Sequence, residues 1–161
     1  MDAPFTPPCP ANCDACLRAC PMGAIRPDGL DATRCMRYFM DGAEYPFLIY
    51  EAQRTHMGCE LCQAACPQNA HLAFGTPSEM ERSAFALPRL IAGDAKEART
   101  LVGRNMTGNG KLTAEAICFA AREGLFEEEI RAAMETTSFP AVKRAARWAL
   151  QRYFHQKITE L

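Results

Sequence analysis

The chain contains no long apolar segment. None of its 161 residues belongs to an apolar run that approaches the roughly 20 residues needed to span a bilayer, so we expect no membrane-spanning helix. The residues before Cys9 lack the basic and apolar stretches of a signal peptide, and we expect a cytoplasmic protein. The formal net charge is only -1, which does not indicate a general nucleic-acid binder.

Residues typical of hydrolytic or acid–base catalysis are also sparse. The histidines His56, His71 and His155 are scattered along the chain. No Ser–His–Asp, Cys–His or paired-carboxylate constellation stands out. We therefore assign no catalytic residue and expect that the chain alone does not catalyse a reaction.

Cysteine, in contrast, is abundant and ordered. Eight of the nine cysteines lie in the first 66 residues. The first run, CPANCDACLRACP, extends from Cys9 to Pro21, and the second, CELCQAACP, extends from Cys59 to Pro67. Both contain C-x2-C-x3-C-P, the core of the run with which bacterial ferredoxins hold [4Fe–4S] clusters. Two such runs, each closed by Cys-Pro, predict two [4Fe–4S] clusters.

Disulfides, zinc and a redox-active pair are the competing interpretations. A disulfide framework is disfavoured because the chain shows no export signal, the cysteine number is odd and the spacing suits metal ligands. Four-cysteine zinc sites also use C-x2-C pairs, but they do not need a third cysteine followed by proline. A thioredoxin-type C-x2-C pair would require a strand–helix context, which neither pair has. Zinc therefore ranks below iron–sulfur, and the redox pair ranks below zinc.

Two clusters require eight ligands, and the two runs supply seven. The eighth is either the isolated Cys35 or His56, which stands three residues before Cys59. We favour Cys35, because thiolate is a far commoner cluster ligand than imidazole. Cys118 lies among Ile117, Phe119 and Ala120, and we expect it to pack in a helical core.

The cysteine before each proline is expected to reach the cluster that the other run mainly holds. This crossover predicts one cluster held by Cys9, Cys13, Cys16 and Cys66. It predicts a second cluster held by Cys20, Cys35, Cys59 and Cys62.

The predicted fold class is α+β, with a bacterial two-cluster ferredoxin-like domain followed by an all-α region of HEAT-like helical hairpins. We expect the cluster domain at residues 1–74, a linker with one helical turn at 75–93, and the hairpins at 94–161. Asp31 or Thr33 should cap a helix that runs to Met40. Gly124 should end the helix from Lys111, and Ser138 should begin the next long one.

These motifs resemble the double-cluster domain of the epoxyqueuosine reductases. The resemblance is carried by the first run, by LDATRC at residues 30–35 and by GCELCQAACPQN at residues 58–69. It independently implies that Cys35 is a ligand, and the helical tail is similar to that family's C-terminal HEAT-like region. One difference is the spacing from Cys9 to Cys13, which is x3 where the family has x2. That departure suggests a related branch with another substrate.

The resemblance implies a role in the last step of queuosine synthesis in tRNA, in which a cobalamin domain removes an epoxide oxygen and the clusters feed it electrons. That domain precedes the clusters in the family, whereas only eight residues precede Cys9 here. Cobalamin is therefore expected only in a partner or a missing domain. We predict an electron-transfer module served by a flavodoxin-like or ferredoxin-like donor.

Two alternatives remain open. The first is a stand-alone ferredoxin-type carrier for another corrinoid or redox enzyme. The second is a tRNA-binding module in which the clusters are structural. Its motivation is the basic helix from Lys143 to Arg152, in a C-terminal end whose positive excess comes from Lys143, Arg144, Arg147, Arg152 and Lys157. A solvated charged face is the more ordinary explanation of such a charge run.

Overall fold

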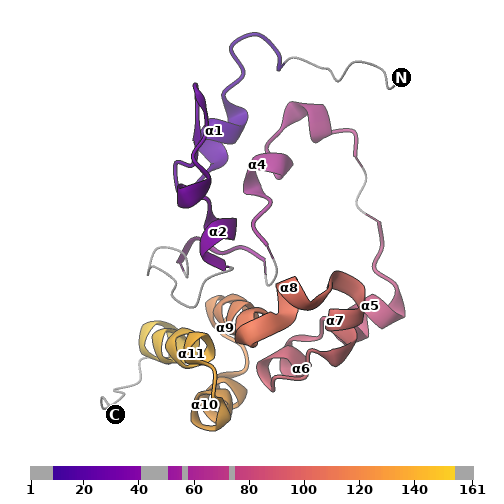
Figure 1. The fold of residues 1–161 in the computed structure, drawn as a ribbon, viewed down its shortest axis with the longest axis vertical. Helices are drawn as coiled ribbons and strands as arrows, with labels where there is room; N and C mark the ends of the chain where they lie inside the picture. The colour runs from indigo at the N-terminus through magenta and orange to yellow at the C-terminus, as the bar shows by residue number, and fades with distance from the viewer. Residues whose placement is uncertain (1–8, 41–50, 56–57, 73–74, 155–161) are drawn as a thin grey trace. The chain divides into compact units, whose positions relative to one another are not determined.

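The computed structural model describes residues 9–40, 51–55, 58–72 and 75–154 (Figure 1). The chain divides into two compact units. A cysteine-rich unit comprises Met1–Cys35 and Glu60–Phe74, and a helical unit comprises Met36–Cys59 and Gly75–Leu161. The described residues are mostly helical with one two-stranded sheet, which confirms the fold class at this level. The ferredoxin-like and HEAT-like classes and the predicted domain boundaries stay predictions.

The cysteine-rich unit is built from very short elements. They are α1 (Ala15–Ala19), β1 (Ile25–Arg26), β2 (Gly29–Leu30), η1 (Ala32–Arg34), α4 (Leu61–Ala64) and η2 (Pro67–Asn69). The two strands are antiparallel, with Ile25 opposite Leu30, and α1 packs against α4. Among the described residues of this unit, Ala24 is the one apolar residue that is fully buried. The unit therefore has almost no hydrophobic core.

The predicted helix start at Asp31 is confirmed, but the helix is interrupted. The Asp31 carboxylate accepts the Thr33 N–H at 3.2 Å and caps η1. Cys35 then adopts an extended conformation, with φ -66° and ψ 131°, and α2 (Met36–Met40) begins after it. Cys35 thus stands at a break between two short helices.

The helical unit is organised around one buried helix. Besides α2 it contains α5 (Glu79–Ala84), α6 (Leu87–Ile91), α7 (Lys96–Val102), α8 (Arg104–Thr107), η3 (Gly108–Gly110), α9 (Lys111–Arg122), α10 (Glu127–Thr136) and α11 (Pro140–Tyr153). Helix α9 packs against α6, α8 and α11, and nearly all its residues from Leu112 to Ala121 are buried. Most of these buried residues are small or apolar, as burial all round a helix requires, and Thr113 and Glu115 are the polar exceptions. No helix of the described residues is both long enough and apolar enough to cross a bilayer.

Residues 75–93, predicted as a linker with one helical turn, contain the two helices α5 and α6. Ser78 and Glu81 form a capping box at the start of α5, in which each side chain bonds the other residue's backbone N–H. This S-x-x-E signal is readable in the sequence. Leu90 and Ile91 of α6 are fully buried, so the segment belongs to the packed helical unit.

The ends of α9 and α11 test two predicted helix boundaries. Gly124, with φ 70°, follows α9 and donates its N–H to the carbonyl of Ala121, while Leu125 donates to Ala120. This pair of bonds is a Schellman motif and confirms the prediction. The N-cap of α11 is Phe139 and not Ser138, so that prediction is wrong. The Thr137 hydroxyl accepts the N–H of Phe139 itself at 3.1 Å, and no side chain caps the first turn of α11.

Gly110 joins η3 to α9 in the left-handed conformation, with φ 72°. A Cβ atom there would lie 2.6 Å from Cγ2 of Val142 and 2.9 Å from Cβ of Phe139. Gly124 has a similar φ of 70°, but a Cβ atom at that position would meet nothing within 4 Å. Alanine substitutions at Gly110 and Gly124 can therefore separate the cost of backbone strain from the cost of steric overlap.

We expect Gly110→Ala to lower the free energy of unfolding by about 3 kcal/mol, because left-handed strain and overpacking against α11 add. Gly124→Ala should cost about 1 kcal/mol, since only the strain applies. Urea unfolding followed by circular dichroism measures both. Equal losses in the two variants would show that the loop accommodates the Cβ atom at Gly110.

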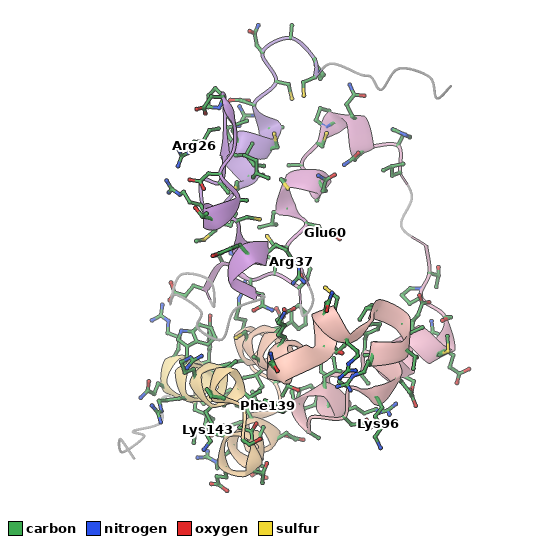
Figure 2. All side chains as sticks on the ribbon, in the orientation of Figure 1. Arg26, Arg37, Glu60, Lys96, Phe139 and Lys143 are labelled. Carbon is green, nitrogen blue, oxygen red and sulfur yellow. The ribbon has the colours of Figure 1, made fainter. Side chains whose placement is uncertain are left out.

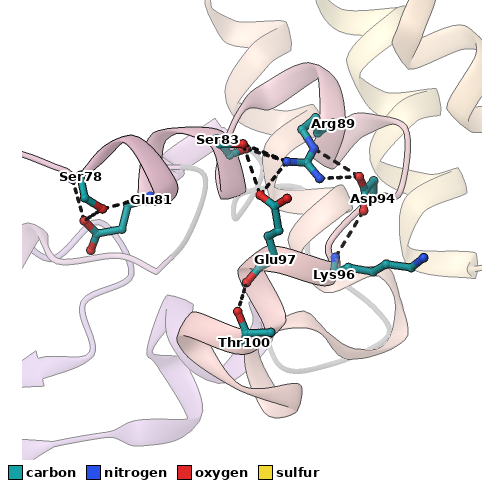
Figure 3. Close-up of polar contacts among 8 residues, drawn as sticks. All are labelled: Ser78, Glu81, Ser83, Arg89, Asp94, Lys96, Glu97 and Thr100. Carbon is teal, nitrogen blue, oxygen red and sulfur yellow. Dashed lines mark hydrogen bonds and ion pairs between the residues drawn. The ribbon is translucent and has the colours of Figure 1, made fainter.

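Arg89 connects α5, α6 and α7 (Figure 3). Its guanidinium donates to Asp94 at 2.7 and 3.2 Å, to Glu97 at 2.7 Å and to the Ser83 hydroxyl at 3.0 Å. These hydrogen bonds hold the pKa of Asp94 and the pKa of Glu97 below their ordinary values. A carboxylate whose pKa is lower in the folded state stabilises that state while it is ionised.

The stabilisation by Asp94 and Glu97 should be complete above their ordinary pKa values, about 4. It should be lost as the pH falls through the lowered values in the folded protein. We expect the melting temperature of the wild-type chain to fall more between about pH 6 and about pH 3 than that of Arg89→Met. The difference should be modest and should shrink in high salt, because the network is partly exposed. Identical pH dependence in the two proteins would contradict this account.

Candidate metal centre

The structure separates the predicted cluster ligands from the remaining cysteine by burial. All nine cysteines are free thiols. Cys118 is fully buried, whereas the eight predicted ligands are partly or fully exposed. Burial raises the pKa of the Cys118 thiol well above its ordinary value, and the Glu115 carboxylate raises it further. Cys118 is buried in α9, as predicted for a residue that packs in a helical core.

The two cysteine runs share the same local backbone. Helices α1 and α4 each begin after an acidic residue, Asp14 or Glu60, whose ψ is near zero at 15° and 20°. Each run then reaches its Cys-Pro pair in an extended conformation, with φ -78° and ψ 108° at Cys20, and φ -72° and ψ 120° at Cys66. The residue before a proline is pushed into this region by contact with the ring.

The chain also turns in the same way after each Cys-Pro pair. The carbonyl of Cys20 accepts the N–H of Gly23 at 3.2 Å, and the carbonyl of Cys66 accepts the N–H of Asn69 at 2.9 Å. Since α1 packs against α4, the first run and the second run from Glu60 onward lie next to each other within the cysteine-rich unit (Figure 1). The two runs must be neighbours in this way if the last cysteine of each run is to bind the cluster that the other run mainly holds.

The surroundings of Cys20 fit a thiolate that binds iron. Its Sγ accepts the N–H of Ala24 at 3.3 Å. Partial burial raises the pKa of the Cys20 thiol, but backbone N–H groups outweigh this effect and leave the pKa below its ordinary value. The donors are Ala24, Met22, Ile25 and Gly23. N–H groups directed at sulfur stabilise cluster thiolates and tune reduction potentials.

The remaining ligand candidates lie in connecting segments. Cys35 separates η1 from α2, and its N–H bonds the Ala32 carbonyl at 3.1 Å. Cys59 follows Gly58, which has φ 80°, and precedes α4. His56, the alternative eighth ligand, lies outside the described residues.

Within the described ranges, no three side chains of His, Cys, Asp or Glu gather closely enough to hold one metal ion. A cubane is larger than one ion and spaces its four thiolates more widely. The two four-cysteine ligand sets therefore stay predictions.

Residues 9–69 match the model of the 4Fe-4S double cluster binding domain. An epoxyqueuosine reductase of Bacillus anthracis is 26% identical over 164 residues, which are 92% of this chain and 42% of that protein. An uncharacterized protein in a gldA 3′ region of Geobacillus stearothermophilus is 26% identical over 169 residues, 98% of this chain and 78% of that protein. A solved structure of epoxyqueuosine reductase from Bacillus subtilis aligns with a TM-score of 0.69 at 26% identity, covering 92% of this chain and 43% of that one.

These similarities confirm the predicted resemblance to epoxyqueuosine reductases. They also confirm the predicted cofactors, two [4Fe–4S] clusters. The chain spans 42% of the length of the first of these reductases. All eight predicted ligands fall within the matched residues, and Cys118 falls outside them.

We expect Cys35→Ala to lower the iron content by about four per chain, because one cubane loses its fourth thiolate. Cys118→Ala is the matched control and should keep both clusters, as should His56→Ala. Iron and sulfide analysis of anaerobically reconstituted protein measures the difference. Loss of a cluster in His56→Ala, with full content in Cys35→Ala, would reverse the choice of eighth ligand.

Proposed function

Because the chain carries a 4Fe-4S double cluster binding domain and is homologous to epoxyqueuosine reductases, we propose that it is an iron–sulfur electron-transfer module. In this role it corresponds to the part of those enzymes that feeds electrons to cobalamin during queuosine synthesis. The observation that carries the proposal is the pair of C-x2-C-x3-C-P runs, which share one backbone conformation on neighbouring helices.

The proposed ligands follow the crossover between the runs. One cluster is held by Cys9, Cys13, Cys16 and Cys66, and the other by Cys20, Cys35, Cys59 and Cys62. The partial exposure of these thiols supports the assignment, since iron and sulfide must reach them. The N–H groups around Cys20 support it further, because they favour the thiolate form that binds iron.

When bound, [4Fe–4S] clusters supply one-electron transfer. Cys9 is the most exposed of the proposed ligands and marks a place where a redox partner can approach. We propose that the chain accepts single electrons from a flavodoxin-like or ferredoxin-like donor. It delivers them to a corrinoid held by another domain or protein, in the reducing compartment that free thiols require.

A stand-alone carrier is the second candidate. The Geobacillus stearothermophilus relative favours it, since this chain covers 78% of that protein. In that case the acceptor is a separate corrinoid or redox enzyme. Both candidates share the same ligands and differ only in the acceptor.

Binding to tRNA is the candidate from another class. Lys143, Arg147 and Arg152 of α11 are exposed, and Lys143 is labelled in Figure 2. Arg152, however, pairs with Glu51 at 3.3 Å, which reduces the free positive charge, and Lys157 lies outside the described residues. We therefore rank electron transfer above RNA binding, and we propose that the helical unit corresponds to the HEAT-like region of the relatives.

Anaerobic preparations should contain about eight irons and about eight sulfides per chain and should take up about two electrons from dithionite, one for each cubane. The chain alone should not convert epoxyqueuosine-containing tRNA to queuosine, and added cobalamin should not change this. Conversion should appear only when a corrinoid-binding domain is supplied separately. A colourless protein that holds zinc would refute the cluster assignment. Turnover by the chain alone would refute the proposal that the corrinoid is held by another domain or protein.

A further inference from the structure

Helix α9 carries a carboxylate inside the core of the helical unit. Glu115 is 1% exposed and is the one charged residue among the described residues that is fully buried. Its neighbours along the helix, Ala114 and Ala116, are fully buried as well. Burial of a carboxylate is costly unless hydrogen bonds and an opposite charge offset it. The position therefore calls for a reason other than packing.

The partners of Glu115 come from the segments next to two proposed cluster ligands. Its Oε2 accepts the N–H of Gly58 at 3.3 Å, directly before Cys59. Its Oε1 lies 3.8 Å from Nη1 of Arg37, two residues after Cys35. The buried Glu115 carboxylate thus contacts the backbone just before Cys59 and an arginine side chain just after Cys35.

The segment before Cys59 is fixed by further bonds. Gln53 is fully buried and donates to the Thr55 carbonyl at 2.8 Å and to the Glu115 carbonyl at 3.1 Å. The Thr55 hydroxyl donates to the Gly58 carbonyl at 2.7 Å. Gly58 can therefore direct its N–H at the Glu115 carboxylate while its carbonyl stays bonded to Thr55.

The segment after Cys35 is anchored to the same helices. Met36 is 2% exposed. Arg37, labelled in Figure 2, also donates to Sδ of Met106 in α8 at 2.7 Å. Arg37, which follows Cys35, and Gly58, which precedes Cys59, thus both contact Glu115 of α9.

We propose that Glu115 is a positioning residue for Cys35 and Cys59. Its carboxylate fixes the backbone that precedes Cys59 and the helix that follows Cys35, so that both thiolates are presented to the second cluster. An apolar residue could fill the same space, but it could neither accept the Gly58 N–H nor form an ion pair with the Arg37 guanidinium. The inference rests on the proposed ligand sets.

Two substitutions separate the charge of Glu115 from its hydrogen bond, and a third controls for stability. Glu115→Gln keeps an acceptor for Gly58 and removes the charge, whereas Glu115→Leu removes both at similar volume. Thr113→Val is the matched control, because Thr113 is buried on the same helix but lies on a different side of it, where it lines a cavity of about 470 Å³ together with Val142 and Phe139. Circular dichroism reports whether each variant folds.

The measurement is the rate at which reconstituted protein loses iron to a chelator, together with the electron paramagnetic resonance spectrum after dithionite reduction. We expect Glu115→Leu to release half of its iron about tenfold faster than the wild type, since a charged hydrogen bond in a buried site is lost. Glu115→Gln should release that half about threefold faster, because a neutral bond replaces a charged one. The other half should leave at the wild-type rate in both variants.

The spectrum distinguishes positioning from general destabilisation. After its faster half is lost, Glu115→Leu should show the same spectrum as Cys35→Ala, because both then hold only the first cluster. Thr113→Val should keep wild-type kinetics even if its melting temperature falls. If Glu115→Leu does not fold, Glu115→Gln decides the question alone.

Equal release rates in wild type, Glu115→Gln and Thr113→Val would overturn the role of Glu115 and leave the proposed function intact. Faster loss of both clusters together, in proportion to the fall in melting temperature, would also overturn it. A wild-type chain that fails to hold two clusters would instead refute the proposed function.

Discussion

The cysteine-rich unit has to be held together by something other than a hydrophobic core. Ala24 is its one fully buried apolar residue among those described, and its sheet has only two residues per strand. Small domains with so little apolar burial depend on disulfides, metals or assembly. The cysteines are free, so coordination of iron is the interaction that can supply the missing stability, since metal binding energy becomes folding energy in such units.

Proline gives the two runs their common geometry. In each run a short helix ends at or just before a cysteine that the following ring holds in the extended region. The chain then turns back through one hydrogen bond to the cysteine carbonyl. The final cysteine is thereby separated from the helical cysteines of its own run, which is the local requirement for serving the other cluster.

Features encoded locally were predictable from the sequence, and features that depend on distant partners were not. The Asp31 cap and the Gly124 helix end each need only neighbouring residues, and both are confirmed. Helix α5 was also local, since its capping box is visible in the sequence, but the nearby Gly75, Pro77, Pro88 and Gly93 favoured a linker. The Ser138 prediction is wrong because α11 begins at Pro140, one residue later than expected, and has no side-chain cap.

The contact between Glu115 and Gly58 could not be predicted, because the two residues are 57 positions apart. In the sequence Glu115 is one acidic residue of an amphipathic helix, and such residues usually face solvent. Its burial follows from the way α6, α8 and α11 surround α9, a tertiary effect that no local pattern encodes.

The helical unit therefore does more than follow the clusters along the chain. It includes the segment from Met36, which directly follows the proposed ligand Cys35, to the proposed ligand Cys59. It also anchors both ends of that segment at α9. A cluster domain cut at residue 74 would keep every proposed cysteine but lose the carboxylate that holds Gly58 and Arg37. The similarity to epoxyqueuosine reductase of Bacillus subtilis covers 92% of the chain and so includes both parts. This joint occurrence is what we expect if the helices help to place the cysteines.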